Sequence, residues 1–426
     1  MQSALQEWQR GSLNNQIRAN NNDSEGLIIG RVRSVVRTLL RRFLSVFGKR
    51  GPVRGVYQSS RDFFKKSSAG TSNSPIFSVI FPSATVDRTP PTDTSPDLAD
   101  KFEKIRSHDF PECFVINIPR GRVVSDRGMV LTPDHRLLFD VSNQMSVRND
   151  FGKVHHHQAF RRNIFPPIEK AGKRVAVLAT AGGGNFFHWI TEALPRLKLL
   201  EKNEDGNLDR IDSFVINKGS SFLQESLDIL GIGKERTIET DWNSHLQAEE
   251  LLVPSLPGVT LNPPRWACEF LRERVLPYGS GEGSGNRLYI RRGENQRRGV
   301  VNDEEIIDAL HEFGFTAVDP GAHSLREQIA IFGGAEMIVG SHGGALTNLL
   351  WCNPGTKVLE LLPHSGLSGW FWPYCYWALS NSCDLEYHCF GAQDSKVAQE
   401  NELYAEQSFS VDEVRSWVKQ HMRSGA

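Results

Sequence analysis

Hydrophobic and polar positions divide most of the chain into two kinds of segment. From Lys101 onward, short apolar, β-branched runs alternate with segments whose apolar residues recur every three or four positions. The first pattern predicts buried strands and the second predicts amphipathic helices. The runs expected to be strands are 174–180, 213–218, 251–255, 287–292, 315–320, 337–341 and 357–362. The expected helices are 221–231, 302–314 and 324–334.

Alternation of strands and helices is typical of parallel, doubly wound sheets, so the expected fold class is α/β. Gly231 and Gly314 stand where two helices should end, because glycine closes helices in the left-handed conformation. Asn302, with Glu305 three residues later, has the sequence of a capping box.

The glycine- and serine-rich stretch 278–286 is the best break in the folded part. It separates two expected α/β domains, residues 101–278 and 286–426. Two such domains with their parallel sheets facing a central cleft are suited to holding a ligand at the carboxyl ends of the strands.

The first hundred residues, 1–100, have a different pattern and are expected to be an N-terminal extension. Residues 1–26 are polar and rich in asparagine, which predicts disorder. Residues 27–50 combine an apolar stripe of helical period with basic residues and no acid. This basic amphipathic helix is expected either at an anionic membrane surface or docked on the protein itself or a partner. Residues 67–98 are rich in Ser, Thr and Pro, which favours a linker.

Composition narrows the possible functions. The formal net charge of −1 gives no electrostatic signal for nucleic-acid binding. The six cysteines form no C-x-x-C pair, so reduced cysteines and no metal site are expected. The N-terminus has no signal-peptide core, and no run of about 18 apolar residues predicts a membrane-spanning helix. A cytoplasmic protein is expected, peripheral at the inner face of the cell membrane if residues 27–50 bind lipid.

Residues 182–200, GGGNFFHWITEALPRLKLL, place a polar stripe on a helix expected after the strand 174–180. A histidine with an acid one turn later can supply a general base and its orienting group, so His188 and Glu192 are the candidate catalytic residues, in either assignment. A buried histidine with a structural partner is the alternative. The candidate acceptor-binding residues are Asn185, Trp189 and Arg196, with core packing as the alternative for the tryptophan.

A second candidate site follows the apolar run 337–341. A glycine loop there leads into a helix, and backbone N–H groups at a helix start bind anions such as a diphosphate. A tight turn without a ligand is the alternative. Glu360 follows in the next strand, where it could accept hydrogen bonds from ribose or be solvated. Paired arginines after the strand 287–292 suit phosphate oxygens, with a solvated basic loop as the alternative. The candidate diphosphate- and ribose-binding residues are Arg292, Arg298, His342, Gly343, Gly344, Thr347, Asn348 and Glu360.

Three blocks of these residues resemble the glycosyltransferase 61 family. Residues 185–197 resemble its N-(Y/F)-F-H-W…E…L-P-R-L block, residues 288–305 its Y-I-S-R…R…N-E-x-E block, and residues 340–361 its G-x-H-G-A-G-L-T-N…P-G…E-L block. The blocks stand in the family's order. Two departures are Arg291 in place of Ser, and Gly344-Ala345 in place of Ala-Gly.

The resemblance implies a GT-B fold of two Rossmann-like domains, with the nucleotide sugar held mainly by the C-terminal one and the acceptor by the N-terminal one. It implies inversion at the anomeric carbon, with no cofactor and no obligatory metal. The expected function is transfer from a nucleotide sugar, with UDP as the expected nucleotide, to a glycan or lipid-linked glycan. The expected pathway is surface or capsular polysaccharide synthesis in a bacterial-type member. A non-catalytic nucleotide-sugar or glycan-binding protein is the alternative.

Overall fold

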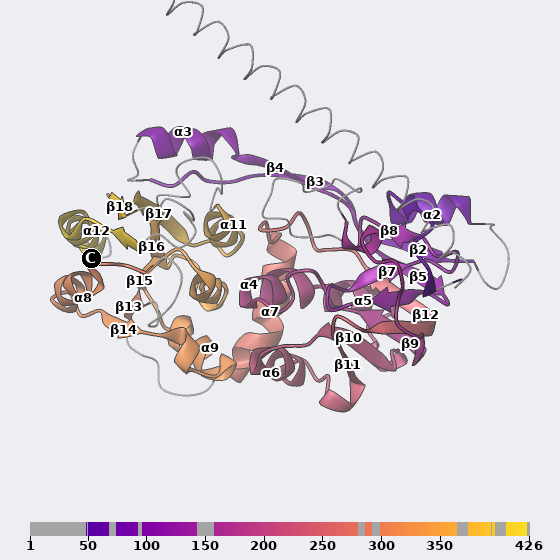
Figure 1. Ribbon diagram of the computed structural model, residues 1–426. Coiled ribbons are helices and arrows are strands. Elements are labelled where there is room, and N and C mark those ends of the chain that lie inside the picture. The colour runs from indigo at the N-terminus through magenta and orange to yellow at the C-terminus, as the bar shows by residue number, and fades with distance from the viewer. Residues whose placement is uncertain are drawn as a thin grey trace, which may run out of the picture.

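The computed structural model describes residues 48, 50–67, 74–92, 96–142, 157–279, 286–291, 299–363, 374–392, 394–396 and 406–423. Two sheets lie on opposite sides of a central group of helices (Figure 1). The expected α/β class is confirmed, and both sheets contain parallel strands. Among the described residues, no helix combines the length and the apolar character needed to cross a membrane.

The C-terminal sheet has five parallel strands in the order β14-β13-β15-β16-β17. They are β13 (Arg287–Ile290), β14 (Thr316–Val318), β15 (Met337–Ser341), β16 (Lys357–Leu362) and β17 (Glu386–Gly391). Numbered along the chain, this order is 2-1-3-4-5, a doubly wound arrangement. Its direction of winding reverses between β13 and β15, and ligands of such sheets bind at the carboxyl ends of the strands at that point.

Helices cover both faces of this sheet because its apolar side chains point to both sides. On one face, α8 (Asp303–His311) and α12 (Val411–Arg423) share a core with Tyr289. On the other face, α9 (Leu325–Gly333) and α11 (Cys375–Ser382) belong to a core that continues into the first sheet. This shared core joins the two halves of the molecule.

The first sheet has ten strands in the order β1-β8-β7-β6-β12-β9-β10-β11, with β5 pairing to both β12 and β2. They are β1 (Val56–Tyr57), β2 (Ile76–Phe81), β5 (Cys113–Pro119), β6 (Arg122–Val124), β7 (Met129–Leu131), β8 (Leu137–Leu138), β9 (Glu169–Val177), β10 (Ser213–Asn217), β11 (Thr237–Thr240) and β12 (His245–Pro254). Only part of it is the expected parallel sheet. β9, β10, β11 and β12 are parallel, whereas β6 and β7 are joined by a short turn that requires antiparallel pairing.

The expectation that folding begins near Lys101, after a linker at 67–98, is wrong for the described residues. β2 lies within that segment and pairs antiparallel with β5, and β3 (Ala84–Asp87) pairs with β4 (Ser107–Phe110). The run IFSVIF in β2 is a strand signal that the Ser/Thr/Pro-rich surroundings concealed. The predicted helix 27–50 lies outside the described residues except for its end, as does the asparagine-rich segment before it.

Residues 84–92, which we call the strap, connect the first sheet to the C-terminal one. Figure 1 shows β3, β4 and α3 (Pro96–Lys104) running along one side of both sheets. Thr89 donates its backbone N–H to Oδ1 of Asn381 at 2.7 Å, and Trp377 donates its indole N–H to the Thr89 carbonyl at 2.7 Å. The strap is therefore fixed to α11.

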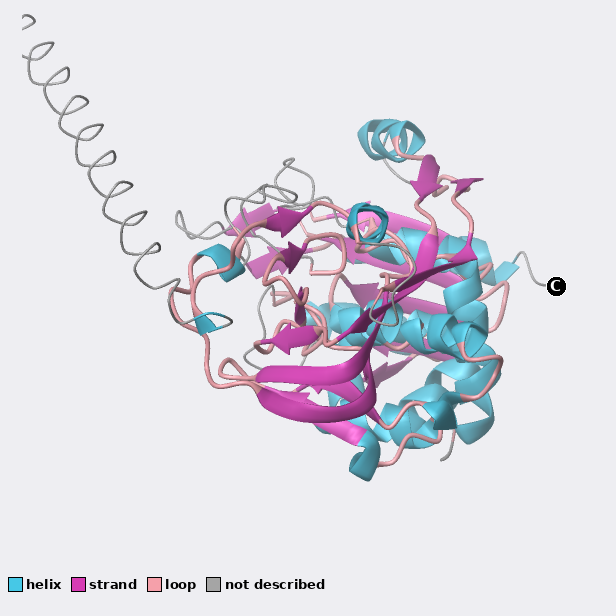
Figure 2. Cartoon of the chain, turned by 90° about the vertical axis from the view of Figure 1, so that its right-hand side faces the viewer, coloured by secondary structure: helices cyan, strands magenta, loops and turns pink. Residues whose placement is uncertain are grey.

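From the side of the first sheet, most helices gather to the right and below the strands (Figure 2).

Helix ends follow the sequence only where the cap is local. α6 (Ser221–Ile229) and α8 are followed by Gly231 and Gly314 with φ of 79° and 74°, as predicted. The capping box expected at Asn302 is absent, because its side chain pairs with the backbone of Phe409, donating to the carbonyl at 2.8 Å and accepting from the N–H at 3.2 Å. Ser324 and Glu327 form a capping box on α9 instead.

Candidate active site

β9 is followed by a glycine run, residues 182–184, that turns the chain into the short helix α4 (Phe186–His188). Asn217, the last residue of β10, holds this turn. Its Oδ1 accepts from the N–H of Thr180 at 3.0 Å, and its Nδ2 donates to the Thr180 carbonyl at 2.8 Å. A Cβ atom at Gly183 would lie 1.9 Å from Oδ1 of Asn217, so only glycine fits there. Asn185 then caps α4, accepting from the N–H of Phe187 at 3.0 Å.

The segment after α4 is not the single amphipathic helix that its spacing predicts. α4 continues into a π-helical turn, η4 (Trp189–Ala193), and α5 (Arg196–Asn203) begins after Pro195. A π-helical turn shifts the register of the faces and is frequent at functional sites. All side chains from 187 to 197 are buried, so His188, Glu192 and Arg196 of the expected polar stripe do not face water, whereas Asn185 is exposed.

His188 and Glu192 face each other inside the protein. Nδ1 of His188 lies 3.0 Å from Oε1 of Glu192, an ion-pair distance, although its angles are not those of a hydrogen bond. The same Oε1 accepts from the hydroxyl of Thr260 at 2.6 Å and from the backbone N–H of Leu261 at 3.0 Å. Two hydrogen-bond donors and the imidazole of His188 thus converge on one carboxylate oxygen.

These contacts decide the charge of the carboxylate. Burial by itself raises the pKa of Glu192, but His188, Thr260 and the Leu261 N–H together outweigh burial and leave the pKa below its usual value. Leu261 reaches this position with φ of 66°, a left-handed conformation that is unfavourable for leucine. The backbone is therefore strained at the residue that holds the Glu192 carboxylate.

The structure does not place Trp189 and Arg196, two of the three candidate acceptor-binding residues, for acceptor contact. Trp189 is 0% exposed and donates its indole N–H to the hydroxyl of Ser226 at 2.8 Å, so it packs in the core. Arg196 is 1% exposed, and its guanidinium donates to the Pro254 carbonyl at 2.5 Å and the Ala179 carbonyl at 3.4 Å. Burial lowers the pKa of Arg196 to about 9. The Arg196 guanidinium ties together the carboxyl ends of β9 and β12. Hydrophobic periodicity in the sequence could not reveal this structural role.

A second histidine–carboxylate pair lies after β15. Nδ1 of His342 is 2.5 Å from Oε1 of Glu360 in β16, and Tyr387 in β17 donates its hydroxyl to the other oxygen of that carboxylate. Burial raises the pKa of Tyr387 well above its usual value, and the Glu360 charge adds to this. Glu360 is 0% exposed. It is neither a ribose ligand in this conformation nor a solvated carboxylate, because it orients His342.

The glycine loop leads into a 3-10 helix, η9 (Gly344–Trp351), in place of an α-helix. Gly343 has an extended backbone, with φ of 172°, and is buried, whereas Gly344 is exposed, so the backbone of Gly344 is open to a ligand. Thr347 and Asn348 are fully buried. Asn348 donates to Gln328 of α9 at 2.8 Å and accepts from the indole of Trp351 at 3.0 Å, so it supports the loop from behind.

The two histidine pairs, distant in sequence, approach each other in space. α4 packs directly against η9. Tyr376 of α11 lies between them, with its ring centroid 5.7 Å from that of Phe187 and 5.1 Å from that of His342. The loop after β9 and the loop after β15 therefore meet, and the second of these is at the position where the C-terminal sheet reverses its winding.

The two arginines predicted to bind the diphosphate, Arg292 and Arg298, lie outside the described residues. Arg291, which stands where the family has serine, donates from Nε to Asp303 at 3.0 Å and also pairs with Glu304. Arg291 is therefore engaged with the start of α8.

Three residues of this region carried no motif by which the sequence pattern could find them. Thr260 and Leu261 follow β12, and Tyr387 comes from β17. The one available signal was position, since Thr260 lies in the loop at the carboxyl end of a strand that neighbours β9. Loops at that edge are where ligand-binding residues gather in α/β sheets.

The fold and the two pairs define an α/β protein with a Rossmann-like parallel sheet and histidine–carboxylate pairs at facing strand ends. The family model described as Glycosyltransferase 61 matches residues 186–359, less than half of the chain. The match includes both histidines and Glu192, and it ends directly before Glu360. The resemblance predicted from the sequence blocks is confirmed over this segment. No curated protein matches the chain.

Proposed function

We propose that the protein is an inverting glycosyltransferase that moves a sugar from a nucleotide sugar to a hydroxyl group of a glycan or lipid-linked glycan. The observation that carries the proposal is the meeting of α4 with η9, which brings the His188–Glu192 and His342–Glu360 pairs to neighbouring strand ends. The match to the glycosyltransferase 61 model, which covers His188, Glu192 and His342, supports the same reaction class.

The proposal includes a GT-B arrangement. Residues 101–278, extended backward by the strands from β1 to β3, would form the acceptor domain, and residues 286–426 would form the nucleotide-sugar domain. The 2-1-3-4-5 strand order of the second sheet supports this assignment, because such sheets bind nucleotides at the reversal point.

In the proposed reaction, His188 is the base and Glu192 orients it. The low pKa of Glu192 and its three contacts make it a poor proton acceptor but a good anchor for the Nδ1 side of the imidazole. Nε2 of His188 then takes the proton of the acceptor hydroxyl. The acceptor oxygen attacks the anomeric carbon from the face opposite the diphosphate, and the departing diphosphate keeps the electron pair of the broken bond.

The leaving diphosphate needs positive charge or hydrogen-bond donors. The backbone at Gly343 and Gly344, together with His342, supplies donors at the start of η9, and Arg292 and Arg298 would add charge. Glu360 and Tyr387 hold His342 in place. The proposal therefore needs no metal. It includes a UDP sugar as donor and a role in surface or capsular polysaccharide synthesis, in the cytoplasm or at the inner membrane face through residues 27–50.

The test is a panel of UDP-, GDP- and CMP-sugars, measured by thermal shift and by slow donor hydrolysis with and without a chelator. Stabilisation by one donor, with nucleotide release that survives the chelator, supports the proposal. His188→Ala should then lower turnover by about 10²–10⁴-fold without loss of donor binding, the usual contribution of a general base. Donor binding without any turnover points to the nucleotide-sugar-binding alternative, and no binding contradicts both.

A further inference from the structure

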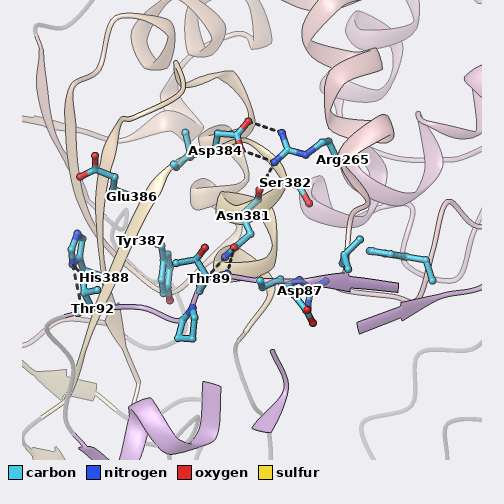
Figure 3. Close-up of a pocket in the computed structure, with 15 residues that line it drawn as sticks. Asp87, Thr89, Thr92, Arg265, Asn381, Ser382, Asp384, Glu386, Tyr387 and His388 are labelled. Carbon is cyan, nitrogen blue, oxygen red and sulfur yellow. Dashed lines mark hydrogen bonds and ion pairs between the residues drawn. The ribbon is translucent and has the colours of Figure 1, made fainter. Parts of the chain in front are cut away.

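A cavity of about 830 Å³ lies between the strap and the C-terminal sheet, and neither histidine–carboxylate pair lines it. Its walls are the strap, the beginning of α7 (Arg265–Val275), the end of α11 and the beginning of β17 (Figure 3). Because β17 begins there, the cavity is at the amino end of the parallel sheet, opposite the His342 loop. Its volume is in the range of small-molecule sites, about 300–1,000 Å³.

Arg88 lines this cavity and is only 5% exposed. Its Nη2 atom has no hydrogen-bond partner among the described residues. The guanidinium lies over the ring of Trp377, 5.3 Å from the centroid. Burial lowers the pKa of Arg88 to about 10; Tyr374 partly offsets this effect, but no carboxylate of the described residues does. A buried arginine stays charged and is costly without a counter-charge, so the position is suited to a bound anion.

The charged residues around Arg88 cannot supply that anion. The carboxylate of Asp384 is already bound by both terminal nitrogens of Arg265, each at 2.5 Å. Asp87 and Glu386 are exposed and come from different walls of the cavity, as Figure 3 shows. Exposed carboxylates are strong acceptors for hydroxyl groups. The cavity thus offers one buried cation together with acceptors for hydroxyl donors.

We propose that this cavity binds an acidic sugar, with the anionic group on Arg88 and hydroxyl groups on Asp87 and Glu386. A sugar carboxylate and a sugar phosphate share the required chemistry. The inference goes beyond the proposed transfer reaction, because binding in this cavity needs no turnover and no nucleotide.

The test measures binding of glucuronate, glucose 6-phosphate and glucose to the full chain by saturation-transfer NMR titration. At least one acidic sugar should bind about tenfold or more tightly than glucose, since a hydrogen bond to a charged group contributes about 1.5–3 kcal/mol. The comparison between the two acidic sugars decides between carboxylate and phosphate. Arg88→Gln should remove the preference. Arg106→Gln, the same change at an exposed arginine that does not line the cavity, should keep it.

Equal binding of glucose and the acidic sugars, or no binding of either acidic sugar, overturns the proposal. An unchanged preference in a folded Arg88→Gln variant also overturns it. If that variant does not fold, competition on the wild-type protein decides: inorganic phosphate should displace the bound acidic sugar but not weaken binding of glucose. Failure of phosphate to compete contradicts an anion site at Arg88, and it leaves the proposed transferase function untouched.

Discussion

Removing the hydroxyl of Thr260 tests whether this residue holds the Glu192 carboxylate. Thr260→Val keeps the shape of the side chain but deletes the donor that lies 2.6 Å from Oε1. Hydrogen bonds to charged groups contribute about 1.5–3 kcal/mol, and Glu192 is buried, so solvent cannot replace the lost donor. For a chain of this length, 1 kcal/mol corresponds to about 1 °C in Tm, which predicts a decrease of about 1.5–3 °C at pH 7.

The pH dependence of this decrease follows from the direction of the pKa shift. The folded-state pKa of Glu192 is below its ordinary value of 4.5. Such a carboxylate contributes stability that is present above the ordinary pKa and is lost as the pH falls through the folded pKa. Thr260→Val raises the folded pKa, so its deficit should be full near neutral pH and should shrink in acid below the ordinary value.

The assay is thermal unfolding of wild-type, Thr260→Val and Thr260→Ser proteins from neutral to acid pH. Thr260→Ser keeps the hydroxyl and should remain close to wild type. A valine variant with wild-type Tm at neutral pH would refute the assignment, and so would a deficit that does not change with pH. If the protein turns over a nucleotide sugar, the valine variant should also have an altered acid limb in its pH–rate profile.

Three further predictions concern buried or half-buried polar groups. Burial raises the pKa of Asp140 from 3.8 to about 6. The stabilising contribution of this side chain is therefore present below about pH 4 and is lost as the pH rises through 6. Asp140→Asn should gain in Tm over wild type between these pH values, and parallel Tm curves of the two proteins would contradict this. Tyr387→Phe deprives the buried Glu360 carboxylate of a donor and should lower the Tm by about 1.5–3 °C, whereas an unchanged Tm would show that the contact contributes nothing. Trp189→Phe deletes the indole donor to Ser226 and should cost about 0.5–1.5 kcal/mol in the free energy of unfolding, with an unchanged KM for the acceptor. A raised KM with an unchanged Tm would return Trp189 to the acceptor site.

Features that depend on neighbouring residues could be predicted from the sequence. The apolar runs gave β15 and β16 with the bounds that the structure has, and Gly231 and Gly314 follow their helices in the left-handed conformation as expected. The His188–Glu192 contact was also predictable, because it joins residues four apart. Period and spacing report local geometry, so these features needed no knowledge of the fold.

Features that depend on which segments meet were decided by the tertiary structure. Asn302 and Ser324 both have a glutamate three residues later, yet only Ser324 forms the capping box, because the backbone of the distant Phe409 supplies partners for Asn302. Arg196 has a helical spacing typical of a surface residue but is buried against two strand ends. A polar side chain has the same pattern in sequence whether it faces water or a buried partner.

In the candidate site too, local contacts could be predicted from the sequence, whereas contacts between distant segments could not. The family blocks located His188, Glu192 and His342, which the matched model also covers. Thr260, which lies 68 residues from Glu192, and Tyr387, which lies 27 residues from Glu360, became visible only in the folded chain. Burial makes each carboxylate require a partner, and the packing of separate strands decides which residue that partner is.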